Sequence, residues 1–155
     1  MKKVQQVGGI IDFGGYILND KLNPSKLFVR PCYKDLWSQI CSDNRHYMIQ
    51  GSPGIGKSLF AAYLLWQFAH FNGPPYIVWA IKSCGFAVVF SMQEEECLKL
   101  KLEDIVEWLL FNKSKQGNTI ILVDGIDPPI GLARCIVTTS PNSAPKVEKQ
   151  KFELR

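Results

Sequence analysis

Apolar residues in this chain occur in two patterns, short unbroken runs and longer stretches with helical spacing. Unbroken runs are typical of buried strands, whereas apolar positions three and four residues apart are typical of helices. The turn Lys82-Ser-Cys-Gly85 separates two of the runs and makes them a hairpin. This order predicts an α/β fold with a mainly parallel sheet and an inserted β-hairpin. The predicted strands are 46–50, 76–81, 86–90, 119–124 and 134–139, and the predicted helices are 31–42, 59–71 and a helix opened by Glu94-Glu-Glu96 that continues to Leu109.

The two ends of the chain are patterned more weakly than its middle. Residues 1–26 contain two Gly-Gly pairs around Ile10–Phe13, which we expect to be a short strand or an ordered arm. Residues 27–143 contain all the predicted helices and strands and are assigned to one domain, for which a chain of 155 residues is long enough. Residues 144–155 are expected to be a polar tail, and the domain to be truncated after the strand 134–139.

A glycine-rich loop lies between the first predicted strand and the helix 59–71. It reads Gly51-Ser-Pro-Gly-Ile-Gly-Lys-Ser58, which fits the P-loop pattern G-x-x-x-x-G-K-S. Glycines allow the backbone to turn several N–H groups inward around a phosphate, and the following helix adds the positive end of its dipole. Lys57 is expected to reach the β- and γ-phosphates of a nucleotide, and the alternative is a turn that binds no ligand. The predicted phosphate-binding residues are Gly51, Ser52, Pro53, Gly54, Ile55, Gly56, Lys57, Ser58 and Leu59.

A carboxylate ends the predicted strand 119–124. Thr119-Ile-Ile-Leu-Val-Asp124 has the unbroken apolar run of a buried parallel strand. In a P-loop fold, a carboxylate at this position binds the water shell of Mg²⁺ and contacts the loop Ser or Thr. We therefore predict that Asp124 lies beside Ser58, that these two residues hold Mg²⁺, and that Lys57 and Asp124 are catalytic.

Hydrolysis of a bound nucleotide needs a further group that orients the attacking water. Gly125 occupies the position where many ATPases carry Glu, which leaves Asp127 as the nearest acid. Thr139 ends the last predicted strand, and Ser140 and Asn142 follow it. Either these residues face the γ-phosphate or the attacking water, or Ser140-Pro-Asn142 forms a hydrogen-bonded turn.

An arginine often stabilises the charge of the transition state in these enzymes. Arg134 begins a predicted strand, so it is expected at the end of the sheet opposite the nucleotide, and Arg155 lies in the tail. The expected source of an arginine is therefore a second protomer.

Composition adds little to this interpretation. The net charge of +4 suits an anionic ligand, but the basic residues alternate with acids and lack an aromatic stacking pattern, so nucleic-acid binding is not expected. The five cysteines are scattered and suggest neither a disulfide framework nor a zinc site. No apolar run approaches the ~18 residues of a membrane span, and no secretory signal is evident, so we expect a soluble protein of the cytoplasm or nucleus.

Three segments together resemble the ATPase module shared by Crinkler effector proteins and retrotransposon hot spot proteins. The resemblance covers roughly residues 27–143, and its first and third segments distinguish it from P-loop proteins in general. The segments are Phe28-Val-Arg-Pro-Cys-Tyr-Lys-Asp-Leu36, which is similar to V-R-x-C-Y-x-x-L; Ile49 to Phe60 with Tyr63; and Ile121-Leu-Val-Asp-Gly125 with Pro128, followed by Thr139-Ser-Pro-Asn142.

The resemblance implies an AAA-like P-loop ATPase module with a three-layer α/β/α fold that binds ATP and Mg²⁺. Such modules are often fused to an effector domain, and a secreted or host-cell location follows only from the family. The preference for ATP over GTP also rests on the resemblance. The sequence shows no N-K-x-D segment that would recognise guanine.

Other functions remain open beside the ATPase. One is a nucleotide-gated interaction module with negligible turnover, and another is a fragment that does not fold alone. A small-molecule kinase normally carries a lid with arginines, and the sequence shows no such segment.

Overall fold

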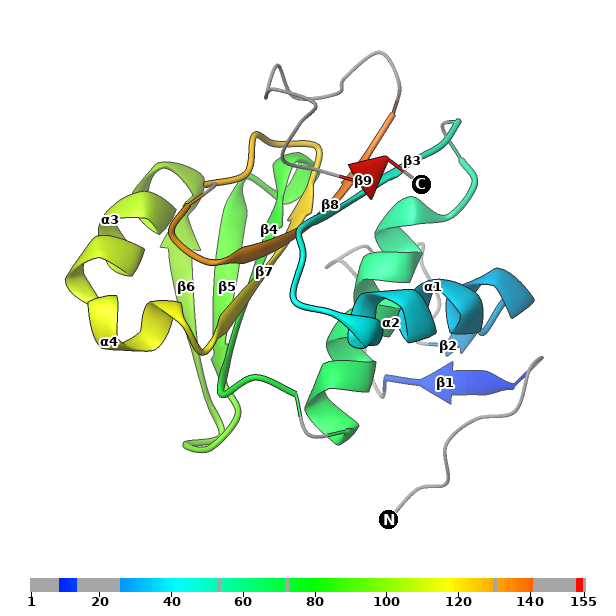
Figure 1. Cartoon of the computed structure of the whole chain (residues 1–155), viewed down its shortest axis with the longest axis horizontal. Coiled ribbons are helices and arrows are strands. Elements are labelled where there is room, and N and C mark those ends of the chain that lie inside the picture. The colour runs from blue at the N-terminus through cyan, green and yellow to red at the C-terminus, as the bar shows by residue number, and fades with distance from the viewer. Residues whose placement is uncertain are drawn as a thin grey trace.

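A computed structural model describes residues 9–13, 26–52, 54–71, 73–129, 131–140 and 153–154. In this part of the chain, seven strands form one sheet in the order β6-β5-β4-β7-β8-β3-β9, and β1 pairs with β2 (Figure 1). The strands are β1 (Ile10–Asp12), β2 (Lys26–Phe28), β3 (Tyr47–Gln50), β4 (Tyr76–Ile81), β5 (Phe86–Ser91), β6 (Glu96–Lys101), β7 (Thr119–Asp124), β8 (Arg134–Thr139) and β9 (Glu153–Leu154). The helices are α1 (Pro31–Ser42), α2 (Lys57–His70), α3 (Ile105–Phe111) and α4 (Lys113–Gln116), with 3-10 turns at Lys82–Cys84 and Leu102–Asp104.

The sheet is parallel over most of its width. β4 pairs with β7, β7 with β8 and β8 with β3, all in parallel, so β8 separates β3 from β7. β5 and β6 continue from the other edge of β4 as antiparallel strands. The predicted α/β class and the hairpin of β4 and β5 are confirmed, and β6 extends that hairpin by one strand.

The sheet does not end at β8. Glu153–Leu154 forms β9, which pairs in parallel with Tyr47 and Met48 of β3. β9 therefore lies within the predicted polar tail of residues 144–155, and it adds one strand to the sheet beyond the strand 134–139. Parallel pairing joins main-chain groups, so a polar sequence can provide the short edge strand.

Alternate residues of the central strands enter two separate hydrophobic cores. Ile120 and Leu122 of β7 pack in the core that contains residues of α1 and α2, whereas Ile121 and Val123 pack in the core that contains residues of α3. Successive side chains of a strand point to opposite faces, so the sheet is covered on both sides (Figure 1). This explains the unbroken apolar run of β7, because each residue from Ile120 to Val123 has a core to enter.

Helices α1 and α2 form one of the two covering layers. Pro31 lies in the first turn of α1, where its missing N–H costs nothing. Helix α2 buries side chains around most of its surface, as its apolar sequence predicts, because it contacts both the sheet and α1. Trp37 of α1 meets Phe68 of α2 edge to face with ring centroids 5.0 Å apart, so Trp37 is a packing residue.

The sequence prediction is wrong for residues 94–101. The expected helix begins only at Ile105, and Glu96–Lys101 forms strand β6 instead. Glu95 has a left-handed φ of 54°, and Ser91 Oγ donates a hydrogen bond to Glu94 Oε2 at 2.8 Å, so these acids belong to a tight turn. β6 then pairs with β5 along its whole length, and this pairing outweighs the helical spacing of the leucines. The short helix α4 covers Lys113–Gln116, for which the sequence predicts neither a helix nor a strand.

Strands β1 and β2 join the N-terminal part of the chain to the core that contains residues of α1 and α2. Ile11 and Leu27 are buried, and Val29 N–H donates to the carbonyl of Gly9 at 2.9 Å. Ile10–Asp12 is therefore a strand, which is one of the two structures expected for this segment. Its packing makes it part of the same unit as the residues that follow it.

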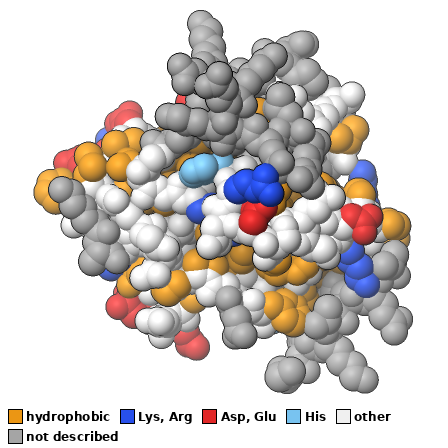
Figure 2. All heavy atoms as spheres, in the orientation of Figure 1, with side chains coloured by type: hydrophobic (Ala, Val, Ile, Leu, Met, Phe, Trp, Pro, Cys, Tyr) orange, Lys and Arg blue, Asp and Glu red, His pale blue; other side chains and the backbone are white. Residues whose placement is uncertain are grey.

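Charged side chains are distributed over the surface in both signs. On the face drawn in Figure 2, Lys and Arg side chains lie among Asp, Glu and apolar side chains. Within the described ranges, none of the helices combines the length and the apolarity needed to cross a membrane.

His46 links the start of β3 to β8. Its Nδ1 accepts a hydrogen bond from the backbone N–H of Cys135 at 3.0 Å. Burial, together with the nearby Arg134 guanidinium, lowers the pKa of His46 below its usual 6.5. Below pH 6.5 the histidine of the unfolded chain binds a proton more readily than folded His46 does. The contribution of His46 to the free energy of unfolding is therefore complete above pH 6.5, and it is lost as pH falls through the folded pKa.

We therefore expect the melting temperature to fall when the pH is lowered from about 7.5 to about 5.5, and to fall less in His46→Gln. Circular dichroism melts of both proteins at both pH values measure this difference. The same loss in the two proteins would contradict the role assigned to His46.

Candidate functional site

The glycine-rich loop joins the end of β3 to the start of α2, at the carboxyl edge of the parallel strands (Figure 1). Gly54 and Gly56 have φ values of 80° and 93°, in the left-handed region that a Cβ disfavours. A Cβ at Gly51 would lie 2.1 Å from Cδ1 of Ile55, because the Ile55 side chain folds back over Gly51. The turn therefore favours glycine at Gly54 and Gly56 through φ, whereas a Cβ at Gly51 would require the Ile55 side chain to move.

Lys57 is the first residue of α2, and its side chain reaches back across the loop. Its Nζ donates hydrogen bonds to the carbonyl oxygens of Gly51 and Ser52, each at 2.8 Å. The N–H groups of the first turn of a helix have no partner within the helix, and the dipole makes this end positive. The ammonium group and the helix end therefore place positive charge at the same loop.

Ser58 and Asp124 are in contact, as the sequence predicts. The Ser58 hydroxyl donates a hydrogen bond to Oδ2 of Asp124. Thr138 Oγ1 donates to the other carboxylate oxygen, Oδ1, at 3.1 Å. Thr138 lies directly opposite Asp124 in the pairing of β7 with β8, which fixes this second contact. Each oxygen of the carboxylate is thus held by one hydroxyl, and the group is fixed beside the start of α2.

Arg30 and Tyr33 also contact the loop, and the residue pattern alone does not predict this. Arg30 Nη1 donates to the carbonyl of Ile55 at 2.6 Å, and the Tyr33 hydroxyl donates to the carbonyl of Gly56 at 3.0 Å. Burial raises the pKa of Tyr33 although the Arg30 charge opposes the shift, so the hydroxyl stays protonated and remains a donor near neutral pH. The only signal in the sequence is that both residues belong to the first segment of the family resemblance.

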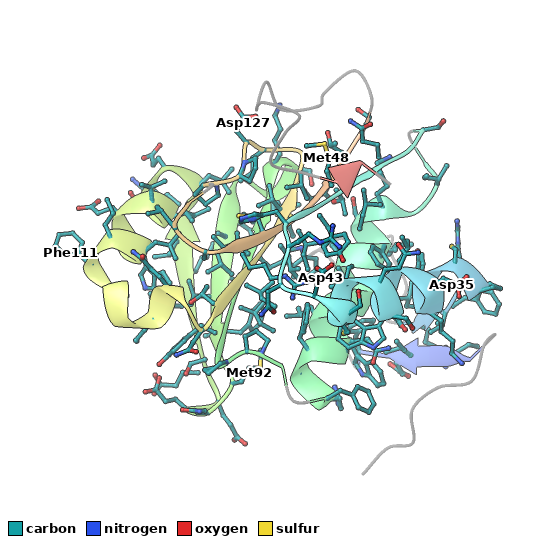
Figure 3. All side chains as sticks on the ribbon, viewed as in Figure 1. Asp35, Asp43, Met48, Met92, Phe111 and Asp127 are labelled. Atoms are coloured by element: carbon teal, nitrogen blue, oxygen red, sulfur yellow. The ribbon has the colours of Figure 1, made fainter. Side chains whose placement is uncertain are left out.

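The groups predicted to orient water are placed differently from one another. Thr139 is buried, its hydroxyl donates to the Ser140 carbonyl at 3.2 Å, and its own carbonyl accepts a bond from Gly51 N–H at 3.4 Å. It therefore joins β8 to the loop through its main chain. Asp127 is exposed on the loop after β7, near the top of Figure 3. Asn142, like Pro53 of the loop, lies outside the described residues.

The side-chain oxygen atoms at this edge of the sheet suit Mg²⁺ as ligands. This ion retains several waters and takes one or two protein oxygens together with phosphate oxygens. The Ser58 hydroxyl and the Asp124 carboxylate, which touch each other, are oxygen ligands of this kind. In the part of the chain that the structure describes, no three His, Cys, Asp or Glu side chains group to hold a metal by themselves. A magnesium ion here would therefore depend on the phosphates that it binds.

Arg134 lies at the opposite end of the sheet, as the sequence predicts. Its Nε donates to the carbonyl of Arg45 at 2.9 Å and its Nη2 to the carbonyl of Ile40. Burial lowers the pKa of this guanidinium, while the Tyr47 and Asp43 side chains raise it. Arg134 therefore fastens β8 to the end of α1 and is directed away from the loop.

Comparisons of the chain with protein-family models, with curated proteins and with solved structures found no match. The resemblance to the Crinkler-type ATPase module therefore stays an expectation. Conclusions about function rest on the geometry of the loop, of Asp124 and of their contacts.

Proposed function

We propose that this protein is a P-loop NTPase module that binds ATP with Mg²⁺. The observation that carries the proposal is the contact between Ser58, at the end of the glycine-rich loop, and Asp124, at the end of β7. These residues are 66 positions apart, and only the fold brings them together. Ligands of open α/β sheets bind beyond the carboxyl ends of the strands, which is where this pair lies.

Each residue of the site has a distinct task in this proposal. Lys57 and the N–H groups at the start of α2 bind the phosphates. Ser58 and Asp124 hold Mg²⁺, which when bound neutralises phosphate charge. Thr138 keeps the Asp124 carboxylate in place through its hydrogen bond to Oδ1 at 3.1 Å.

Hydrolysis is the further step of the proposal, and a binding module without turnover is the second candidate. The observation that favours the second candidate is the stretch after β7. Gly125 follows Asp124 with a left-handed φ of 75°, and the next acid, Asp127, is exposed. In many ATPases a carboxylate directly after the strand Asp orients the attacking water. Gly125 has no carboxylate, and Asp127 is not adjacent to Asp124. Ser140 and an arginine of a second protomer are the groups that we propose for hydrolysis.

Binding of MgATP to the purified protein tests the first step. We expect one site by isothermal titration calorimetry and a higher melting temperature, since a ligand at 100 times its Kd adds about 2.7 kcal/mol to the free energy of unfolding. Absence of both heat and thermal shift at millimolar MgATP would contradict the proposal. Single-turnover hydrolysis compared with Lys57→Ala separates the ATPase from the binding module, because equal rates would leave only binding.

The wider context is also proposed, from the family resemblance alone. We propose an AAA-like module of the Crinkler type, which acts as part of a larger assembly or beside an effector domain. ATP is proposed over GTP on the same ground.

A further inference from the structure

Two side chains of the α1 segment bind consecutive carbonyl groups of the glycine-rich loop. Arg30 Nη1 lies 2.6 Å from the Ile55 oxygen, and the Tyr33 hydroxyl lies 3.0 Å from the Gly56 oxygen. The peptide group of each carbonyl carries an N–H at its other side, which belongs to Gly56 in the first case and to Lys57 in the second. In a trans peptide these two groups point in opposite directions, and the described residues include no cis peptide bond. The two contacts therefore turn the N–H groups of Gly56 and Lys57 away from α1.

We propose that Arg30 and Tyr33 are positioning residues for phosphate binding. By holding the carbonyls of Ile55 and Gly56, they aim the N–H groups of Gly56 and Lys57 into the loop, toward the phosphate oxygens of a nucleotide. The inference rests on the proposed function, because it explains how that same site is shaped.

Tyr33 is held by packing, whereas Arg30 is exposed and contacts the loop through its guanidinium. The Tyr33 ring lies 5.0 Å from the ring of Phe60 and 5.4 Å from that of Tyr63, and the whole side chain is buried. A Cβ at Gly56 would lie 3.0 Å from the Tyr33 hydroxyl and 3.4 Å from Cζ of Arg30. Glycine at this position therefore lets both side chains approach the main chain, in addition to allowing the left-handed φ.

A purely structural role is the alternative, because the same bonds join α1 to the start of α2. The Gly56 carbonyl also accepts a bond from Phe60 N–H at 2.9 Å. Loss of the Tyr33 hydroxyl therefore leaves this carbonyl with one donor, so Tyr33→Phe is expected to fold. Its ring can remain in the aromatic cluster, and the substitution removes the loop contact alone.

The test uses Tyr33→Phe and Arg30→Ala with one matched control for each. Tyr63→Phe removes a hydroxyl from the same aromatic cluster, but that hydroxyl accepts its bond from Gln67, away from the loop. Lys34→Ala removes a positive charge from the same helix, one turn after Arg30. The measurements are the ¹⁵N–¹H signals of Gly56 and Lys57 with and without MgATP, the Kd for MgATP and the melting temperature.

We expect the Gly56 and Lys57 signals of Tyr33→Phe and Arg30→Ala to differ from wild type before nucleotide is added. Each substitution should weaken MgATP binding about 3- to 10-fold, the factor for one lost hydrogen bond. Tyr63→Phe should lower the melting temperature while leaving those two signals and the Kd unchanged, and Lys34→Ala should leave all three unchanged. If the role were structural alone, the affinity for MgATP would fall together with the melting temperature in all four variants, including Tyr63→Phe.

Two results would overturn the positioning role while leaving the proposed function intact. One is wild-type affinity in both Tyr33→Phe and Arg30→Ala, and the other is a pair of Gly56 and Lys57 signals that do not move in either variant. A wild-type protein that binds no MgATP contradicts the proposed function itself.

Discussion

Lys57→Ala is expected to remove most of the affinity for MgATP. Lys57 Nζ lies 2.8 Å from the carbonyl oxygens of Gly51 and Ser52, so the charge is already held at the loop before a phosphate arrives. A phosphate that loses this charge-assisted partner loses about 2–4 kcal/mol, which raises the Kd roughly 30- to 1000-fold. Calorimetric titration of the variant with MgATP measures the change directly.

A matched control for this variant is Lys101→Ala. Lys101 is exposed on β6, where its Nζ lies 3.8 Å from Glu103, and the substitution makes the same change of net charge. Its Kd for MgATP should match the wild-type value. A Kd of Lys57→Ala within about threefold of wild type would show that the loop does not use its lysine to bind phosphate.

Asp124→Asn is expected to remove the effect of Mg²⁺ on nucleotide binding. Asparagine keeps the size of the side chain and one acceptor oxygen, but it loses the charge beside Ser58. Loss of a group that holds the metal or its water costs about 10- to 100-fold in metal affinity. Titrations of ATP with Mg²⁺ and with a chelator should therefore give nearly equal Kd values in the variant and different values in the wild-type protein.

The control for this substitution is Asp35→Asn. Asp35, labelled in Figure 3, is exposed on α1, and the same loss of charge there should leave the full effect of Mg²⁺. If Asp124→Asn also keeps that effect, then Asp124 is only a structural partner of Ser58. Any single-turnover hydrolysis should fall together with the Mg²⁺ effect.

Most of the secondary structure follows from local patterns in the sequence. The run at β7 and the apolar helix α2 are found because burial on several sides leaves few polar positions. β6 is missed because Leu98, Leu102 and Ile105 have helical spacing, whereas the left-handed turn at Glu95 and the pairing with β5 decide the structure. β9 is not predicted because its pairing with β3 depends on main-chain groups, which every residue carries, so the side-chain pattern does not indicate it.

The candidate site was only partly accessible to sequence reasoning. A motif indicates Lys57 and Ser58, and a carboxylate at a strand end indicates Asp124. Thr139 was singled out at the end of β8, but the neighbouring Thr138 is the residue that bonds Asp124, because strand register decides which of two adjacent hydroxyls faces β7. Arg30 and Tyr33 bind backbone carbonyls 25 and 23 positions later. Because every residue carries such a carbonyl, the sequence does not indicate which one is the partner.

The position of β8 between β3 and β7 has a consequence for how the protein is made. Thr138 lies about 80 residues after Ser58 in the chain, so the loop is synthesised roughly 4 to 16 s earlier at about 5–20 residues per second. Until β8 inserts, β3 has no strand between it and β7, and Ser58 is not brought to Asp124. Parallel pairing over such a separation is slow, because the intervening chain must be closed first. Under the proposed function, a nucleotide would stabilise only the last stage of assembly, and the newly made chain would pass through the earlier stages without it.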